Sequence, residues 1–197
     1  MIFRESYTGG LLIPEECEYF KDRVLFINGP ITRELADKFI MQIGILSKNQ
    51  DEDITVVVSS DGGDVGAGLA ICDAINAAPV MVNALCMQRA YSMGAVIFSS
   101  TPGRRMMAPH AKLMFHEPLI NSMPDGRLSS VKEITKSLSA CKEDLCKIVA
   151  KRSNLPIKKV RDILSSDHYL SLDEAKKLGL ADLEGNIFDV IGGGTSE

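Results

Sequence analysis

Short apolar runs alternate along the chain with segments whose apolar residues recur at the spacing of a helix face. Residues 24–28 and 54–58 are nearly continuous apolar runs, and the second is largely β-branched. Such runs are typical of strands buried on both faces of a sheet. Residues 81–87 and 112–116 predict two further strands.

The segments between these strands predict helices. Thr32 is the predicted N-cap of the first helix, which has one apolar face. That face consists of Leu35, Phe39, Ile40 and Ile43. A sharp turn over residues 59–64 leads into a second helix, which Pro79 ends, and a junction at Ser92 leads into a third. The alternation predicts an α/β domain with a mainly parallel sheet.

A polar segment over residues 119–128 precedes a long predicted helix, in which Ser130 and Glu133 form a capping box. The apolar positions of this helix repeat with heptad spacing. They are Val131, Ile134, Leu138, Cys141, Leu145 and Ile148. Such a seam needs a partner helix. The pattern leaves open whether the seam packs on its own domain or on another subunit.

The remaining segments predict one domain over residues 21–190, preceded by an irregular N-terminal segment over residues 1–20 and followed by a flexible tail over residues 191–197. An axial or gating role is the hypothesis for residues 1–20. A short helix is predicted after Pro156. The last predicted helix begins with a capping box of Ser171 and Glu174 and ends at Gly179.

The length of 197 residues suits one domain, and the net charge is −4 without any Lys/Arg-rich run. This charge pattern argues against a nucleic-acid partner. The uncharged stretches are too short and too interrupted to span a bilayer, and Arg4 and Glu5 stand where a signal peptide has its apolar core. We therefore expect a cytoplasmic protein with no membrane partner.

The cysteines predict neither a metal cluster nor a disulfide framework. They are Cys17, Cys72, Cys86, Cys141 and Cys146, and none forms a CxxC pair. Their odd number and their positions within predicted strands and helices indicate reduced, buried thiols.

Ser92 stands where a strand is predicted to turn into a helix. A hydroxyl at such a bend projects from the end of the sheet, and the helix N-terminus supplies backbone N–H groups that stabilise an oxyanion. Gly62 and Gly63 occupy the equivalent junction one unit earlier and can expose further N–H groups. The same residues also fit an N-cap serine and an ordinary turn in which Asp64 caps the helix.

A nucleophilic serine needs a base, and the chain has three histidines. His116 lies at the end of a predicted strand, His110 in a loop beside two arginines, and His168 just before a predicted helix. Asp167 is the candidate carboxylate that could orient an imidazole. Each of these residues, taken alone, also fits a surface or loop role.

In their order along the chain, these motifs resemble the proteolytic subunit of the ATP-dependent Clp protease over roughly residues 21–189. Residues 60–63 resemble its Ser-Pro-Gly-Gly turn, and Ala-Tyr-Ser-Met-Gly at residues 90–94 resembles its Ala-Ala-Ser-Met-Gly. Residues 108–119 resemble its segment ending in His-Gln-Pro-Leu. Residues 167–179 resemble its segment from the third triad member to Tyr-Gly-Leu.

The resemblance implies that Ser92 is the nucleophile, that His116 is the general base and acid, and that Asp167 is the orienting carboxylate. It implies an oxyanion hole made by two backbone N–H groups, those of Gly63 and Met93. It also implies a substrate bound as an added strand beside three residues, Leu119, Ile120 and Asn121. No metal and no cofactor are implied in this subunit, because ATP is used by the partner ATPase.

The fold implied is a crotonase-like spiral of ββα units with a projecting helical handle at about residues 119–152. The resemblance further implies a homo-oligomer of heptameric rings stacked as a tetradecamer. Its partners would be a hexameric Clp ATPase, unfolded protein substrates and, in mixed rings, a second paralogue of the same family.

Several positions depart from the family pattern. Asp61 stands in place of a proline, Glu117 in place of a glutamine, and Ser165-Ser166 in place of an Asp-Arg pair. These departures motivate a second hypothesis, a weakly active or regulatory paralogue that contributes structurally to mixed rings. A third hypothesis is a crotonase-type acyl-CoA enzyme, which shares the spiral but does not need a Ser-His-Asp set.

Overall fold

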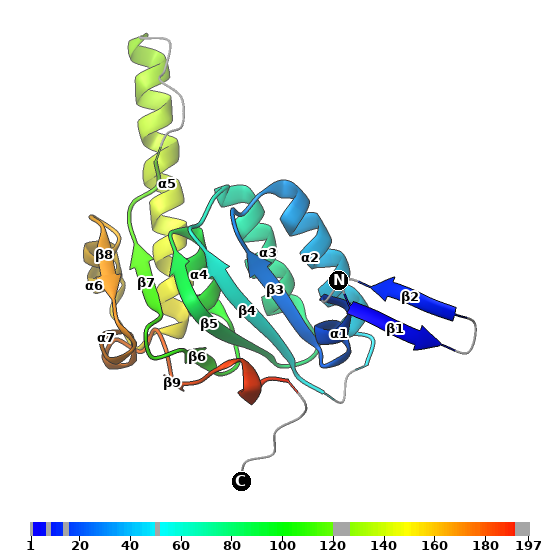
Figure 1. The fold of residues 1–197 in the computed structure, drawn as a ribbon. Helices are drawn as coiled ribbons and strands as arrows, with labels where there is room; N and C mark the ends of the chain where they lie inside the picture. The colour runs from blue at the N-terminus through cyan, green and yellow to red at the C-terminus, as the bar shows by residue number, and fades with distance from the viewer. Residues whose placement is uncertain (1, 7–8, 14–15, 50–51, 120–126, 192–197) are drawn as a thin grey trace.

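The computed structural model describes residues 2–6, 9–13, 16–49, 52–119 and 127–191. Figure 1 shows a main sheet with helices packed on one of its faces, a separate pair of strands, and a long helix that projects from the body. The strands of the 7-stranded sheet are β3 Val24–Asn28, β4 Ile54–Ser60, β5 Val82–Tyr91, β6 Arg105–Met107, β7 Lys112–Phe115, β8 His168–Leu170 and β9 Leu183–Glu184.

The strand order is β3-β4-β5-β6-β9, with β7 pairing to β5 and β8 pairing to β7. All of these pairs are parallel except β7 with β8. The predicted α/β fold with a mainly parallel sheet is therefore confirmed. The β-branched residues of β4 explain its central position, because Ile54, Val56 and Val58 are fully buried.

The helices follow the strands as predicted. They are α2 Arg33–Leu46, α3 Val65–Ala77, α4 Met93–Ser100, α5 Leu128–Arg152, α6 Ile157–Ile163 and α7 Leu172–Lys177, with a short 3-10 helix at Ile187–Asp189. Thr32 and Asp64 cap α2 and α3 through their side chains, and Ser171 and Glu174 form the predicted capping box of α7. Among the described residues, no helix is both long and apolar enough to cross a membrane.

Strand β5 continues to Tyr91, beyond the predicted end at residue 87. Its first part pairs with β6 and its last part, Arg89 to Tyr91, pairs with β7. The apolar run is interrupted here by the polar Gln88 and Arg89, so it did not reveal the extra residues. They form a strand because β7 supplies hydrogen-bonding partners. This fork in the sheet brings the end of β7 beside the residue that follows β5, which is Ser92.

Helix α5 begins at Leu128 with Arg127 as its N-cap, so the predicted capping box at Ser130 and Glu133 is wrong. The amide of Val131 already donates to the Arg127 carbonyl, which starts the helix before Ser130. The predicted seam is divided between two environments. Its C-terminal part, around the buried Leu145, packs on the domain, whereas Val131 is exposed where the helix projects in Figure 1.

The first residues are not irregular, as the sequence had suggested. Strands β1 Ile2–Ser6 and β2 Gly9–Ile13 form an antiparallel pair, and helix α1 Glu16–Lys21 follows. The prediction failed because the apolar stretches here, Ile2-Phe3 and residues 11–13, are short, and the two strands pair with each other through their main-chain groups. The division into a gating segment, a peptidase domain and a tail stays a prediction.

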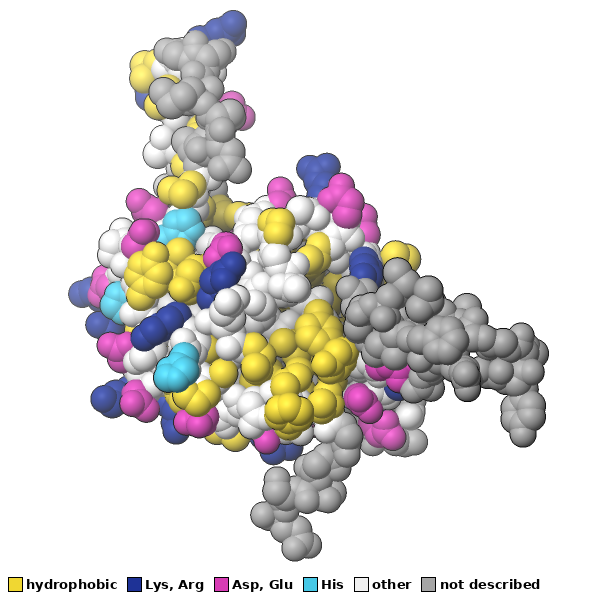
Figure 2. All heavy atoms as spheres, viewed as in Figure 1, with side chains coloured by type: hydrophobic (Ala, Val, Ile, Leu, Met, Phe, Trp, Pro, Cys, Tyr) yellow, Lys and Arg dark blue, Asp and Glu magenta, His cyan; other side chains and the backbone are white. Residues whose placement is uncertain are grey.

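A second apolar cluster lies on the sheet face opposite the long helices α2 and α3. Val24, Val57, Leu85 and Met106 are buried there, and Leu183 and Ile187 from the C-terminal part pack against them. Figure 2 shows apolar side chains gathered on this face of the molecule. The C-terminal segment therefore covers part of a face that the main helices leave open.

Candidate active site

Ser92 joins β5 to α4 in a backbone conformation that non-glycine residues rarely adopt, with φ 53° and ψ −122°. Its amide donates to the Met114 carbonyl at 2.8 Å, which ties the bend to β7. Although Ser92 is the N-cap of α4, its side chain makes no capping hydrogen bond. A strained residue whose hydroxyl is not used to cap its helix is characteristic of functional sites.

His116 follows β7 directly and faces Ser92. The β5–β7 register pairs Tyr91 with Met114, so the two chains leave the sheet side by side. Ser92 Oγ and His116 Nε2 are 2.7 Å apart. In the tautomer with a proton on Nδ1, the hydroxyl donates to Nε2, which is the geometry that a nucleophile and its base require.

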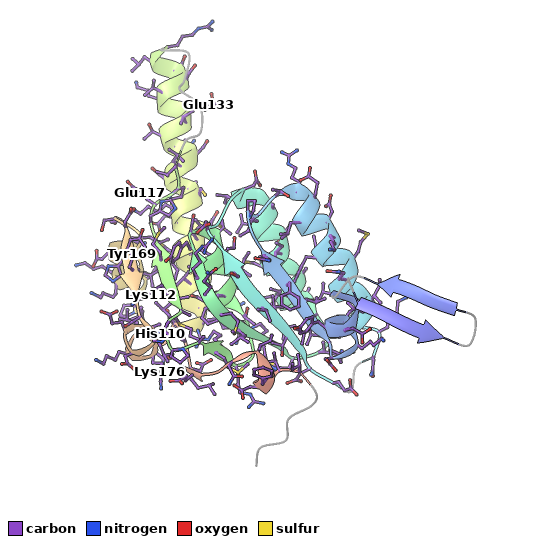
Figure 3. All side chains as sticks on the ribbon, viewed as in Figure 1. His110, Lys112, Glu117, Glu133, Tyr169 and Lys176 are labelled. Atoms are coloured by element: carbon purple, nitrogen blue, oxygen red, sulfur yellow. The ribbon has the colours of Figure 1, made fainter. Side chains whose placement is uncertain are left out.

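The other two histidines lie elsewhere. Figure 3 shows His110 near Lys112, toward the end of β7 remote from the labelled Glu117, and His110 is exposed there as predicted. His168 is exposed on β8 and pairs in register with Phe115 rather than with Ser92. Of the three, His116 alone contacts the serine.

The turn before α3 packs directly against Ser92. Gly62 has φ +98°, and a Cβ placed on it would lie 2.6 Å from the Ser92 Cβ and 2.9 Å from the Tyr91 carbonyl oxygen. Only glycine fits this approach. The Gly62 amide donates to Ser60 Oγ at 3.0 Å, which closes the turn from within.

Gly63 is held by Ile31 in a short parallel bridge. The Ile31 amide donates to the Gly62 carbonyl at 2.9 Å, and the Asp64 amide donates to the Ile31 carbonyl at 2.8 Å. This pattern uses the groups on either side of Gly63 and turns its own N–H away from Ile31. Within the described part of the chain, the amides of Gly63 and Met93 donate no hydrogen bond, so both are available to a ligand.

These groups line one cleft of about 620 Å³. Its wall includes apolar side chains, namely Val65, Met93, Val96, Leu145 and Leu164, together with the carboxylates Asp61, Asp64 and Glu117. Leu119, one of the three predicted substrate-strand residues, also lines the cleft. Ile120 and Asn121 lie outside the described residues.

Strand pairing places Asp167 beside His116, but no hydrogen bond joins the two side chains in the described part of the chain. The β7–β8 register pairs Phe115 with His168, so one step further along the two strands sets His116 across from Asp167. Asp167 is exposed, and in the described residues no hydrogen bond joins its carboxylate to His116. The structure thus brings together Ser92 and His116, with Asp167 on the adjacent segment.

Two charge pairs at the cleft were not predicted. Arg89 forms a two-pronged ion pair with Asp61, with Nε 2.5 Å from Oδ1 and Nη2 3.0 Å from Oδ2. Its hydrogen bonds with Asp61 raise the pKa of Arg89. The sequence does place opposite charges, Asp61 and Arg89, near the ends of two adjacent strands. They were not paired in the prediction because β5 was predicted to end at residue 87, before Arg89.

The second pair joins the long helix to the loops that carry His116 and Asp167. Lys142 Nζ on α5 donates to Glu117 Oε2 at 3.2 Å and to Ser165 Oγ at 3.1 Å. The Ser165 hydroxyl donates in turn to the Arg161 carbonyl at 2.6 Å. Two of the positions that depart from the family pattern are therefore linked through one ammonium group.

The thiols offer no competing nucleophile among the described cysteines. Burial raises the pKa of Cys86 to about 12 and that of Cys72 to about 11, so both stay protonated at neutral pH. Cys141 and Cys146 are also free thiols, and burial raises the pKa of each.

An α/β domain with a serine–histidine pair at the end of a parallel sheet, beside two unpaired main-chain amides, is arranged for acyl transfer. A family model described as Clp protease matches residues 16–184, and the chain belongs to that family. Membership supports a peptidase of the hydrolase class.

Proposed function

We propose that the chain is the serine endopeptidase subunit of a ring-shaped protease fed by a Clp ATPase. One observation carries the proposal: Ser92 Oγ lies 2.7 Å from His116 Nε2 in a cleft that also contains the unpaired amides of Gly63 and Met93. Family membership supports the same reaction class.

In the proposed reaction, Ser92 Oγ attacks the carbonyl carbon of a peptide bond while His116 Nε2 takes the hydroxyl proton. The amides of Gly63 and Met93 donate to the oxyanion of the tetrahedral intermediate. Each such donor is typically worth about 10²–10³-fold in rate. His116 then gives its proton to the departing amine as the C–N bond breaks, which leaves an acyl-enzyme on Ser92.

Water completes the cycle by the same steps. His116 takes a proton from water, the hydroxide adds to the acyl carbon, and the Ser92 oxygen leaves with the proton that His116 returns. Asp167 is proposed to accept a hydrogen bond from Nδ1 and to stabilise the imidazolium. Because that bond is absent from the described residues, this role requires a movement of the Asp167 side chain or segment.

The proposed substrate is an unfolded polypeptide bound as an added strand between the Gly63 turn and residues 119–121. The proposed assembly is a tetradecamer of two heptameric rings in the cytoplasm, with a hexameric ATPase as partner. ATP is consumed by that partner, so this subunit is proposed to work without a cofactor or metal.

The missing Asp167–His116 bond favours a second candidate, a subunit with low activity alone that contributes structurally to mixed rings. Peptide hydrolysis measured with the purified chain alone and after mixing with a second family member separates the two. Full activity of a stable tetradecamer of this chain alone contradicts the second candidate.

The main proposal is tested with a fluorophosphonate probe and a fluorogenic peptide. Intact-mass spectrometry is expected to find a single adduct on the native protein and none on Ser92→Ala. That variant is expected to lose about 10⁵-fold or more of the hydrolysis rate. The control is Ser139→Ala on the exposed face of α5, which should keep both properties. Labelling or turnover that survives in Ser92→Ala contradicts the assignment.

A further inference from the structure

The ion pair of Arg89 and Asp61 joins the 61–63 turn to the strand that leads into Ser92. Asp61 immediately precedes the two glycines of the first turn, and Arg89 stands on the last part of β5, just before Ser92. The Arg89 guanidinium also donates from Nη1 to Gln88 Oε1 at 2.8 Å, which holds it along its own strand. The two-pronged guanidinium, or fork, of Arg89 therefore connects the proposed oxyanion turn to the strand that precedes the nucleophile.

The turn has a particular need for such a connection. Gly62 and Gly63 both have positive φ, at +98° and +155°, and glycine in these conformations is intrinsically the most flexible residue. On its other side the turn is held by Ile31 through the main chain. On the Ser92 side, the turn is joined to β5 by the Asp61 carboxylate, which accepts two hydrogen bonds from Arg89.

Charge gives a second reason. Asp61 lines the same cleft as Ser92 and Gly63. A carboxylate there opposes the negative charge that develops on the substrate oxygen, and at short range this repulsion is appreciable even in partly wet surroundings. Arg89 places a permanent positive charge directly on that carboxylate and so offsets it.

We propose that Arg89 is a positioning residue of the oxyanion turn: its fork fixes Asp61, and with it the Gly63 amide, against β5 and cancels the Asp61 charge beside the developing oxyanion. The inference rests on the proposed peptidase function of this cleft. In this inference, the ion pair formed by Asp61 is what orders the turn.

Exposure distinguishes this role from ordinary stabilisation. The Arg89 side chain is 36% exposed and that of Asp61 is 66% exposed. Ion pairs this exposed contribute little to global stability. Loss of the pair should therefore leave the thermal unfolding midpoint nearly unchanged while it alters the turn and the reaction rate.

The chain offers a matched control in Arg161 and Glu143. This pair has the same two-pronged geometry, at 2.6 and 2.8 Å, and similar exposure, at 43% and 40%. It joins α6 to α5 and involves neither the 61–63 turn nor the end of β5. The variant Arg161→Gln removes an equivalent ion pair without touching the 61–63 turn.

The kinetic test compares Arg89→Gln, Arg89→Lys, Asp61→Asn and the double variant on a fluorogenic peptide. Arg89→Gln should lower kcat about tenfold, a fraction of what loss of a whole oxyanion donor costs, with KM changed less than about twofold. Arg89→Lys should fall between, because it keeps the charge but not the fork. The double variant should be no slower than Arg89→Gln, since Arg89 acts through Asp61.

A second measurement does not depend on activity. In the Ser92→Ala background, hydrogen exchange followed by mass spectrometry should show about tenfold faster exchange at the Gly62 and Asp64 amides after Arg89→Gln. Arg161→Gln should change neither exchange there nor kcat. If Ser92→Ala and wild type hydrolyse peptide equally, the proposed function fails, and the exchange result still decides the role of Arg89. Unchanged exchange, or effects of the two single variants that multiply in the double, overturn the inference.

Discussion

The two sides of the candidate site are held by different amounts of structure. Ser92 and His116 follow β5 and β7, which pair in parallel inside the sheet, and their reactive atoms lie 2.7 Å apart. Asp167 precedes β8, a strand of three residues that pairs with β7 alone in the described sheet, and it is exposed. The nucleophile and base are therefore positioned by main-chain pairing, whereas the carboxylate depends on an edge strand.

This difference has a physical basis. A residue that directly follows a paired interior strand inherits the register of its neighbours, and slipping that register moves every side chain to the other face. A short edge strand has fewer hydrogen bonds to lose and shifts at lower cost. Besides the β7–β8 pairing, the Lys142 bridge to Glu117 and Ser165 is a side-chain contact that joins the Asp167 side to the rest of the site.

The largest expected effect tests the comparison directly. His116→Ala should lower kcat by about 10⁵-fold or more, because the base is already aligned on Ser92. Asp167→Asn should lower kcat by only about 10²–10³-fold, less than in triads whose carboxylate is buried and bonded. Both are measured as single-turnover acylation with a chromogenic ester. Equal losses in the two variants show that Asp167 is as firmly positioned as His116.

A smaller effect sharpens the Ser92 side. Gly62→Ala puts a methyl group 2.6 Å from the Ser92 Cβ and should shift the nucleophile enough to lower kcat by about 10²-fold. The control is Gly44→Ala on α2, where no atom lies within 4 Å of the added Cβ. That variant should keep its activity and gain about 0.5–1 kcal/mol in the free energy of unfolding. An active Gly62→Ala variant contradicts the close packing of the two turns.

The smallest effect on catalysis is expected from a change at Arg105 in β6, which lies outside the candidate site. Arg105, which is buried, donates to Asp182 and to the carbonyls of Ser99 and Arg152. Arg105→Ala should lower the free energy of unfolding by about 1–3 kcal/mol, measured by urea titration, because the partly exposed Asp182 carboxylate loses the guanidinium and keeps, among the described residues, only the amide of residue 105 as a donor. The kcat should change less than about twofold at temperatures where the variant stays folded.

The pH dependence of that loss has a definite sign. Burial by itself raises the pKa of Asp182, but the hydrogen bonds from Arg105 outweigh burial and the net shift is downward. A lowered folded pKa adds stability above the unfolded pKa of about 3.9 and loses it as pH falls through the folded value. The difference between wild type and Arg105→Ala should therefore shrink below about pH 4. A difference that is constant with pH contradicts the ion pair.

Much of the fold could be predicted because its signals are local. The β-branched run of β4, the caps Thr32 and Asp64, and the capping box at Ser171 each act within a few residues. The start of α5 was missed because its N-cap, Arg127, is not one of the residue types that cap a helix with their side chains. The end of β5 was missed because a distant segment, β7, makes it a strand. The β1–β2 pair was missed because its apolar stretches are short and the two strands pair with each other through the main chain.

The sequence by itself determined the parallel α/β architecture, the bend at Ser92 and the candidates His116 and Asp167, because hydrophobic period, caps and glycines act over short distances. Only the tertiary structure decided which of these meet. The β5–β7 register joins Ser92 to His116, and the end of β5 brings Arg89 to Asp61. Asp167, beside the edge strand, makes no hydrogen bond to His116 in the described part of the chain. Contacts between distant segments depend on strand register and sheet order. Neither is encoded in any one stretch of residues.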